Sequence, residues 1–318
     1  MRPAKIPETI VIAIGGNAIT RETEDGNIHQ QFLNIRRALV PVAGLIAQGK
    51  RIVLTHGNGP QVGNMLIRVE ESRHLVPPIP LGVMVADLQG GMGYMIQQTL
   101  QNKLRKRNID RDVVTIITQS IVDRNDPSIL EPSKFVGPVF DEIEIKKFVQ
   151  ERGWQVKVDI GRGWRRVVPS PKPVDFVERR AIAKYIEDGT VVIAGGGGGI
   201  PVYLDEKQHL EGIDAVIDKD LAASVLAASV HAEVLCIVTS VEHVALKFSS
   251  AEQVNLSRIT VEEAEQWLKQ GEFPAGSMGP KIEAAIHFLK NGGKTCIITT
   301  IEKLDDALQG SAGTRITK

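Results

Sequence analysis

Short runs of β-branched and other apolar residues alternate along this chain with longer segments of helical periodicity, and this alternation constrains the fold more than any other feature. Strands that alternate with helices are typical of βαβ units, which build a parallel sheet covered by helices. The runs predicted as strands are Thr9–Ile14, Arg51–Thr55, Val113–Thr118, Thr190–Ala194, Val234–Thr239 and Thr295–Thr300. The predicted helices span Gln30–Gln48, Gln61–Arg73, Pro80–Arg107, Val177–Glu187, Thr260–Gln270 and Pro280–Asn291, with a further one starting at Asp218.

One segment, residues 123–175, breaks the alternation. It holds six prolines and two of the three tryptophans of the chain. A short helix fits Asp141–Arg152, and the remainder is predicted as turns and a small hairpin. We interpret it as a small subdomain inserted into a single domain that spans residues 1–318 and standing off its main sheet.

Composition excludes several classes of protein. The 318 residues include 38 Lys and Arg against 38 Asp and Glu, and this balance argues against nucleic-acid binding. The chain nowhere reaches the roughly 20 apolar residues of a membrane-spanning helix, and the early run Ile10–Ile14 is too short for a signal peptide. Cys236 and Cys296 each lie in an apolar run, which predicts buried thiols in a reducing cytoplasm.

Glycine-rich turns follow three of the predicted strands: Gly15-Gly16-Asn17, Gly57-Asn58-Gly59 and Gly195 to Gly199. In an open α/β sheet, ligands bind beyond the carboxyl ends of the strands. Glycine lets backbone N–H groups approach an anion, and a following helix N-terminus favours negative charge. Any one of these turns could be a plain connection, but together they predict a phosphate site. The fingerprints GxGxxG after the first strand and GxxxxGK[ST] are absent, which argues against Rossmann and P-loop proteins.

Two lysines lie at the starts of predicted helices. Lys219 is flanked by Asp218 and Asp220, where Asp218 is also a natural N-cap. Lys281 follows Gly276-Ser277-Met278-Gly279-Pro280 and falls in the first turn of its helix. Because a cation there opposes the helix dipole, we expect an anion to compensate it.

Acid–base and metal chemistry have no clear signal. The seven histidines show no metal-ligand spacing, and no GxSxG motif occurs. His56 ends a strand in THGNGP, where we favour a hydrogen-bonding role in orienting the loop over a general base. Glycine turns and lysines without a nucleophile suit phosphoryl transfer to the anion of the substrate itself.

The strings IAIGGNA (12–18), THGNGPQVGN (55–64), VPSPKPV (168–174), AGGGGGIPV (194–202), AVIDKD (215–220) and GSMGPKIEAA (276–285) resemble the motifs of carbamate kinases in the amino acid kinase family. The resemblance implies an α/β fold, a three-layer αβα sandwich with a mainly parallel eight-stranded sheet and a small protruding subdomain. It also implies a cytoplasmic homodimer that interconverts ATP and carbamate with ADP and carbamoyl phosphate, using Mg²⁺.

The resemblance also implies roles for individual residues. Lys219 and Lys281 would flank the transferred phosphoryl group, and Asp218 would organise them. The residues implied to hold carbamate are Gly15, Gly16, Asn17, Gly57 and Asn58, and those implied to line the nucleotide are Gly196, Gly197, Gly198, Met278 and Pro280. No residue is implied as a protein ligand of the metal.

One position departs from the wider family. Many amino acid kinases carry a lysine two residues before the first glycine pair, where this chain has Ala13. Lys134, in Pro132-Ser133-Lys134-Phe135, matches the lysine that carbamate kinases supply from the protruding subdomain. We therefore expect the 123–175 subdomain to close over the site and bring Lys134 to it.

Two other functions stay open at this point. The chain could be a nucleotide-binding sensor without turnover, although two phosphoryl-flanking lysines argue against that. It could also be a kinase of the same family that acts on another small carboxylate or on a phosphate monoester. The direction in which the reaction runs, ATP generation or carbamoyl phosphate supply, is not encoded in these motifs.

Overall fold

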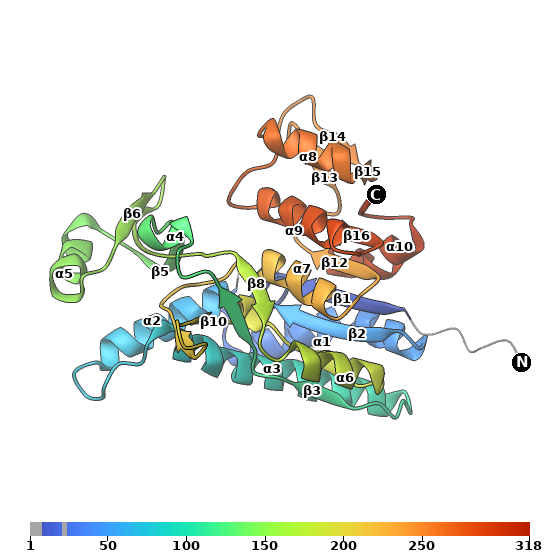
Figure 1. The fold of residues 1–318 in the computed structure, drawn as a ribbon, viewed down its shortest axis with the longest axis horizontal. Coiled ribbons are helices and arrows are strands. Elements are labelled where there is room, and N and C mark those ends of the chain that lie inside the picture. The colour runs from blue at the N-terminus through green and yellow to red at the C-terminus, as the bar shows by residue number, and fades with distance from the viewer. Residues whose placement is uncertain (1–7, 21–23) are drawn as a thin grey trace, which may run out of the picture.

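A central eight-stranded sheet organises the protein, whose computed structural model describes residues 8–20 and 24–318. The strand order is β15-β17-β16-β12-β1-β2-β9-β3, and every neighbouring pair is parallel except β16 and β17 (Figure 1). The predicted mainly parallel eight-stranded sheet is therefore confirmed. The strands are β1 (Thr9–Ile14), β2 (Arg51–His56), β3 (Val113–Thr115), β9 (Val191–Ile193), β12 (Val234–Val238), β15 (Arg258–Thr260), β16 (Thr295–Thr299) and β17 (Thr314–Thr317).

Helices cover both faces of this sheet because its strands are buried on both sides. In β1, Ile10 and Ile12 pack into one hydrophobic cluster, while Val11 and Ala13 pack into another. The first cluster includes α1 (Ile28–Ala47), α3 (Leu81–Lys106) and α10 (Leu304–Gln309). The second includes α6 (Arg179–Glu187), α7 (Lys219–Ser229), α8 (Val261–Lys269) and α9 (Met278–Lys290). The three-layer αβα arrangement is confirmed.

Local sequence signals set many of the helix boundaries. Asn27 and Gln30 form a capping box at the start of α1, and Thr260 and Glu263 form the predicted one at the start of α8. Helix α2 (Gly59–Ser72) begins at the last residue of the second glycine turn. The observed strand β3 ends at Thr115, three residues before the end of the predicted strand Val113–Thr118.

Several observed strands were not predicted from the sequence. A second sheet has the order β11-β10-β4-β8, with β4 (Gln119–Val122), β8 (Pro173–Phe176), β10 (Ile200–Leu204) and β11 (Leu210–Gly212). A hairpin joins β13 (Val244–Leu246) to β14 (Val254–Leu256). These strands are three to five residues long and two contain proline, so hydrophobic periodicity does not distinguish them from loops.

Residues 127–168, here called the arm, extend away from the central sheet (Figure 1). The predicted helix is present as α5 (Glu142–Arg152), with Asp141 as its N-cap. The predicted small hairpin is present as two consecutive antiparallel strands within residues 156–168, and a strand that was not predicted, within residues 134–140, pairs with it to complete a three-stranded sheet. Beside this sheet, the rings of Phe148 and Trp154 stack at 4.5 Å. The arm thus has an apolar centre of its own. Its elements are α4 (Pro127–Leu130), β5 (Lys134–Phe140), α5, β6 (Val156–Asp159) and β7 (Gly163–Val168).

Both cysteines are buried free thiols, as predicted, and burial raises the pKa of Cys236 to about 12. Within the described ranges, no helix combines the length and apolarity needed to cross a membrane.

Candidate active site

A cleft of about 480 Å³ lies where the carboxyl ends of β1, β12 and β16 meet. The chain runs from β1 to β2 on one side and returns to β12 on the other, so this is the switch point where α/β sheets bind ligands. Four predicted site residues line it: Gly15, Gly16, Lys219 and Lys281. Residues that the sequence analysis did not select complete the wall, namely Ala18, Asn34, Arg37, Ala38, Val238, Thr239, Ser240, Thr300, Ile301 and Glu302.

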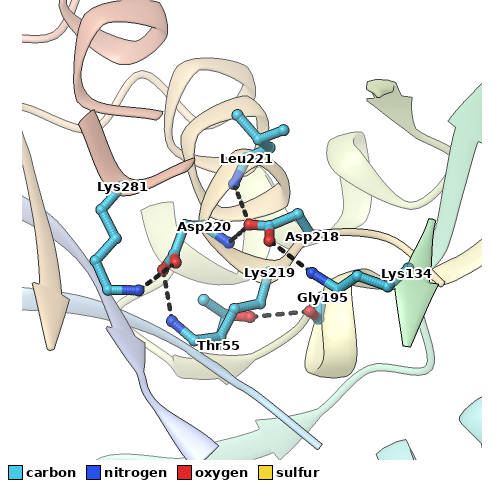
Figure 2. A network of polar contacts seen from close by, with 8 residues as sticks. All are labelled: Thr55, Lys134, Gly195, Asp218, Lys219, Asp220, Leu221 and Lys281. Atoms are coloured by element: carbon cyan, nitrogen blue, oxygen red, sulfur yellow. Dashed lines mark hydrogen bonds and ion pairs between the residues drawn. The ribbon is translucent and has the colours of Figure 1, made fainter. Parts of the chain in front are cut away.

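Lys219 and Lys281 come from different helices but share one carboxylate. The Nζ of Lys219 lies 2.5 Å from Oδ1 of Asp220, and the Nζ of Lys281 donates to Oδ2 of Asp220 at 2.9 Å (Figure 2). The two lysine side chains are 16% and 15% exposed, and that of Asp220 is 4% exposed. The buried carboxylate therefore holds both ammonium groups beside the cleft.

The charge of Asp220 persists in spite of its burial. Burial alone would raise the pKa of this carboxyl, but the charges and hydrogen bonds of Lys219 and Lys281 hold the pKa down to about 2. Asp220 is thus ionised at neutral pH. One negative charge between two ammonium groups leaves a net positive charge, which suits an anionic ligand.

The organising role expected of Asp218 is performed by Asp220, and this corrects the interpretation of the IDKD motif. The Oδ1 of Asp218 accepts the N–H of Asp220 at 2.9 Å, so Asp218 is the N-cap of α7. Its Oδ2 accepts a hydrogen bond from Nζ of Lys134 at 3.0 Å. The signal that could have identified Asp220 is its place after Lys219, but an acidic residue in a first helical turn is common enough to pass as a dipole effect.

The second glycine turn packs tightly against the first. A Cβ on Gly57 would lie 3.1 Å from the backbone N of Gly16 and 3.1 Å from Cδ of Lys219. Asn58, the next residue, is buried, and its Nδ2 has no hydrogen-bond partner among the described residues. A buried amide without a partner is costly unless a ligand or water satisfies it. This part of the site therefore offers a donor for an anion.

The third turn, Gly195–Gly199, lies behind the other two instead of lining the cleft. Gly197 has φ +65°, and a Cβ there would lie 2.1 Å from Nδ2 of Asn58. The carbonyl of Gly195 accepts a hydrogen bond from Oγ1 of Thr55 at 2.9 Å (Figure 2). Gly196, Gly197 and Gly198 are buried, and the absence of a Cβ on Gly197 lets its backbone pack closely against the amide of Asn58. Their nucleotide-lining role stays a prediction.

The remaining predicted residues lie at the edges of the site. Asn17 lies in the 3₁₀ turn Gly16–Ala18 that follows β1, and its side chain is outside the part of the structure that is described. Met278 and Pro280 lie in the first turn of α9, next to Lys281. Met278 is partly buried against the core beneath α9. Lys134 reaches the site through Asp218.

His56 contacts the glycine turns as a neutral side chain. It is buried, and its Nδ1 lies 3.2 Å from the carbonyl oxygen of Gly57, so the tautomer protonated at Nδ1 makes this hydrogen bond. Burial lowers the pKa of His56 to about 4, against the opposite effect of the Gly57 contact. The geometry agrees with the predicted role of orienting the loop.

This histidine should make folding pH-dependent in a defined window. A pKa of about 4 in the folded chain, below an ordinary 6.5, means that its contribution is complete above pH 6.5 and is lost as the pH falls towards 4. The shift corresponds to roughly 3 kcal/mol of unfolding free energy. Urea unfolding between pH 7.5 and 4.5 should show a flatter pH dependence for His56→Asn than for the wild type. Replacing the exposed His74 by Asn is the control, and an equal slope in all three proteins would contradict the assignment.

Comparison with known proteins agrees with this geometry. The sequence profile of the amino acid kinase family matches residues 8–300. The carbamate kinase of Pyrococcus horikoshii is 49% identical over 314 residues, covering 98% of this chain and all of that protein. The carbamate kinase of Clostridium perfringens is 42% identical over 97% of this chain and 99% of its own length.

A solved structure supports the same assignment at the level of the fold. The carbamate kinase from Giardia lamblia bound to AMP-PNP superposes with a TM-score of 0.93 at 39% identity, over 98% of this chain and 99% of that one. Both the family profile and the full-length relatives thus cover the site-bearing strand ends. The chain therefore belongs to the amino acid kinase family, and its similarity to carbamate kinases extends over the whole fold.

Proposed function

We propose that this protein is a carbamate kinase, which transfers a phosphoryl group reversibly between ATP and carbamate. The observation that carries the proposal is the lysine pair on Asp220, which faces a cleft floored by Gly15 and Gly16. Two anionic substrates repel each other, so a catalyst must supply positive charge and N–H donors between them. Full-length similarity to carbamate kinases names carbamate as the acceptor.

The proposed reaction needs no protein base. In the direction of carbamoyl phosphate synthesis, an oxygen of carbamate forms a bond to the γ-phosphorus as the bond from that phosphorus to the bridging oxygen of ADP breaks. The attacking oxygen is already an anion, so no proton is removed. His56 is buried, neutral and bonded to Gly57, in agreement with such a mechanism.

Each part of the site has a proposed role in that transfer. Lys219 and Lys281 stabilise the charge that develops on the transferred phosphoryl group. The turns Gly15-Gly16-Asn17 and Gly57-Asn58 hold carbamate through backbone N–H groups and the free Nδ2 of Asn58. Lys134 adds positive charge from the arm at the position where Ala13 gives none. Gly196 to Gly198, Met278 and Pro280 are proposed on the nucleotide side.

Magnesium is the cofactor implied by the family, and the donor set fits a metal that arrives with the nucleotide. Among the described residues, no three His, Cys, Asp or Glu side chains form a metal-binding group. Mg²⁺ in kinase sites is held by substrate phosphates and water with one or two carboxylates. Glu302, on the cleft wall and without an ion-pair partner in the described ranges, is the carboxylate that would hold it. When bound, Mg²⁺ would neutralise part of the phosphate charge.

We further propose a cytoplasmic homodimer with ATP or ADP and carbamate or carbamoyl phosphate as its small-molecule partners. Buried free thiols suit a reducing compartment. The site is compatible with ATP generation and with carbamoyl phosphate supply.

Formation of ATP from ADP and carbamoyl phosphate tests the proposed function. With Mg²⁺ present we expect robust turnover by the purified protein, and EDTA should abolish it because uncompensated phosphate charge opposes the approach of the two anions. A coupled luminescence assay measures the product. Acetyl phosphate and N-acetylglutamyl phosphate serve as competing phosphoryl donors. ATP binding without turnover would identify a sensor, and turnover of only a competing donor would identify a different kinase of this family.

A further inference from the structure

The carboxylate of Asp218 divides its two oxygens between two parts of the molecule. Oδ1 accepts the N–H of Asp220 at 2.9 Å and that of Leu221 at 3.4 Å, which caps α7. Oδ2 accepts from Nζ of Lys134, the first residue of β5 in the arm. Figure 2 shows Lys134 and Leu221 on either side of this carboxylate. Asp218 thus connects the arm to the helix that carries Lys219 and Asp220.

The exposed fractions of Lys134 and Asp218 indicate which of the two side chains restricts the other. The Lys134 side chain is 40% exposed, so without its contact to Asp218 it would be free to adopt many rotamers. Asp218 is 17% exposed and is fixed by its two backbone hydrogen bonds. A fixed carboxylate that pairs with a mobile lysine restricts the lysine. Asp218 directly precedes Lys219 in the sequence, and Lys134 contacts Asp218 across 84 residues of chain, so the pair lies next to the Lys219–Asp220–Lys281 cluster.

We propose that Asp218 is a positioning residue that holds Lys134, and with it the arm, at the edge of the site before substrate binds. The inference rests on the proposed function for its kinetic part only. Pre-positioning lowers the ordering cost that carbamoyl phosphate must otherwise meet on binding. The residue acts through Lys134 and does not itself touch the transferred group.

Asp218→Asn separates the two functions of this carboxylate. Asparagine is as good an N-cap as aspartate, so its Oδ1 retains the cap on α7. Its Nδ2 is a donor that cannot accept from Lys134, so the ion pair is lost. Lys134→Met removes the same pair from the other side and leaves the cap untouched. Asp141→Asn is the matched control, because Asp141 caps α5 in the arm and has no lysine partner among the described residues.

Hydrogen exchange on the ligand-free protein tests the positioning directly. We expect amides of residues 127–140, where the arm leaves the site, to exchange about fivefold faster in Asp218→Asn and in Lys134→Met, the factor that a partly exposed ion pair of about 1 kcal/mol supports. Asp141→Asn should leave exchange in that segment unchanged. Exchange equal to wild type in both pair-breaking variants would overturn the proposal, whatever the enzyme does with substrate.

Steady-state kinetics test its consequence for the reaction. In Asp218→Asn, KM for carbamoyl phosphate should rise about fivefold while kcat changes less than twofold, since the lost pair ordered the free enzyme. In a Lys134→Met background the same substitution should have no further effect on KM, because the partner is already gone. A lower KM in Asp218→Asn would mean that Asp218 merely repels the anionic substrate, and an undiminished effect in the Lys134→Met background would mean that it acts without Lys134. Either result contradicts the proposal. If the wild type shows no turnover, the proposed function fails while the exchange result still decides the positioning.

Discussion

Replacing Lys219 or Lys281 by alanine should lower kcat by a factor on the order of 10²–10³, as the loss of one oxyanion-type donor does in other enzymes. Both ammonium groups are held by Asp220 beside the cleft, where charge moves between two oxygens of the reacting anions. Their interaction with the phosphoryl group strengthens as that charge develops. Nucleotide affinity should therefore change less than kcat, and measured kcat and Kd for ADP separate the two effects.

Lys290→Ala is the control for these variants. It lies at the other end of α9, is exposed, and pairs with Glu265 at the surface. We expect it to retain the wild-type rate, because surface pairs of this kind contribute little. If Lys219→Ala or Lys281→Ala keeps kcat within about threefold of wild type, the role assigned to that lysine is wrong.

Asp220→Asn should destabilise the folded protein by about 3 kcal/mol, because it leaves two nearly buried ammonium groups without their shared counter-charge. The Asp220 side chain is 4% exposed, so water cannot replace it. The same change should reduce kcat strongly, since the two lysines then repel each other and lose their common anchor. Urea unfolding at pH 7 gives the free energy, and the carbamoyl phosphate assay gives the rate.

The ionised form of Asp220 also sets the pH at which this stabilisation disappears. With a pKa of about 2 in the folded chain, below an ordinary 3.8, its contribution is complete above pH 3.8 and is lost as the pH falls towards 2. This lies below the window of His56, so acid unfolding above pH 4 should be little altered in shape by Asp220→Asn. Glu142→Gln, which breaks an exposed pair with Lys146, is the control and should leave the free energy of unfolding essentially unchanged. Unchanged stability in Asp220→Asn would show that the lysines are already compensated without it.

Much of the architecture could be predicted from the sequence because apolar runs, capping motifs and glycine turns are local signals. The β1 run Thr9–Ile14 is apolar throughout, as a strand buried on both faces must be. Thr260 and Glu263 specify the start of α8 through a four-residue motif. The glycine turns after β1, β2 and β9 could be predicted to lie near one another because the carboxyl ends of parallel strands meet at one edge of the sheet.

Strands that depend on distant partners could not be read in this way. β10 and β17 contain few residues, and their pairing with β4 and β16 is set by neighbours more than fifteen residues away. In the arm, the helix and the small hairpin were predicted but β5 was not, because its pairing with β7 joins distant parts of the segment. A short segment has little intrinsic preference for the β conformation, and the residues that pack against it decide whether it forms a strand.

The site divides along the same line. Glycine turns and helix-start positions in the sequence were enough to predict that the glycines, Lys219 and Lys281 gather at one edge of the sheet, and the resemblance to carbamate kinases implied Lys134. The packing of distant segments was needed to show that Asp220, not Asp218, lies between the two lysines, and that Asp218 pairs instead with Lys134. It also placed Gly196 to Gly198 behind Asn58. The physical reason is that composition and spacing specify charges and backbone freedom, whereas the direction of a side chain depends on which other segments pack beside it.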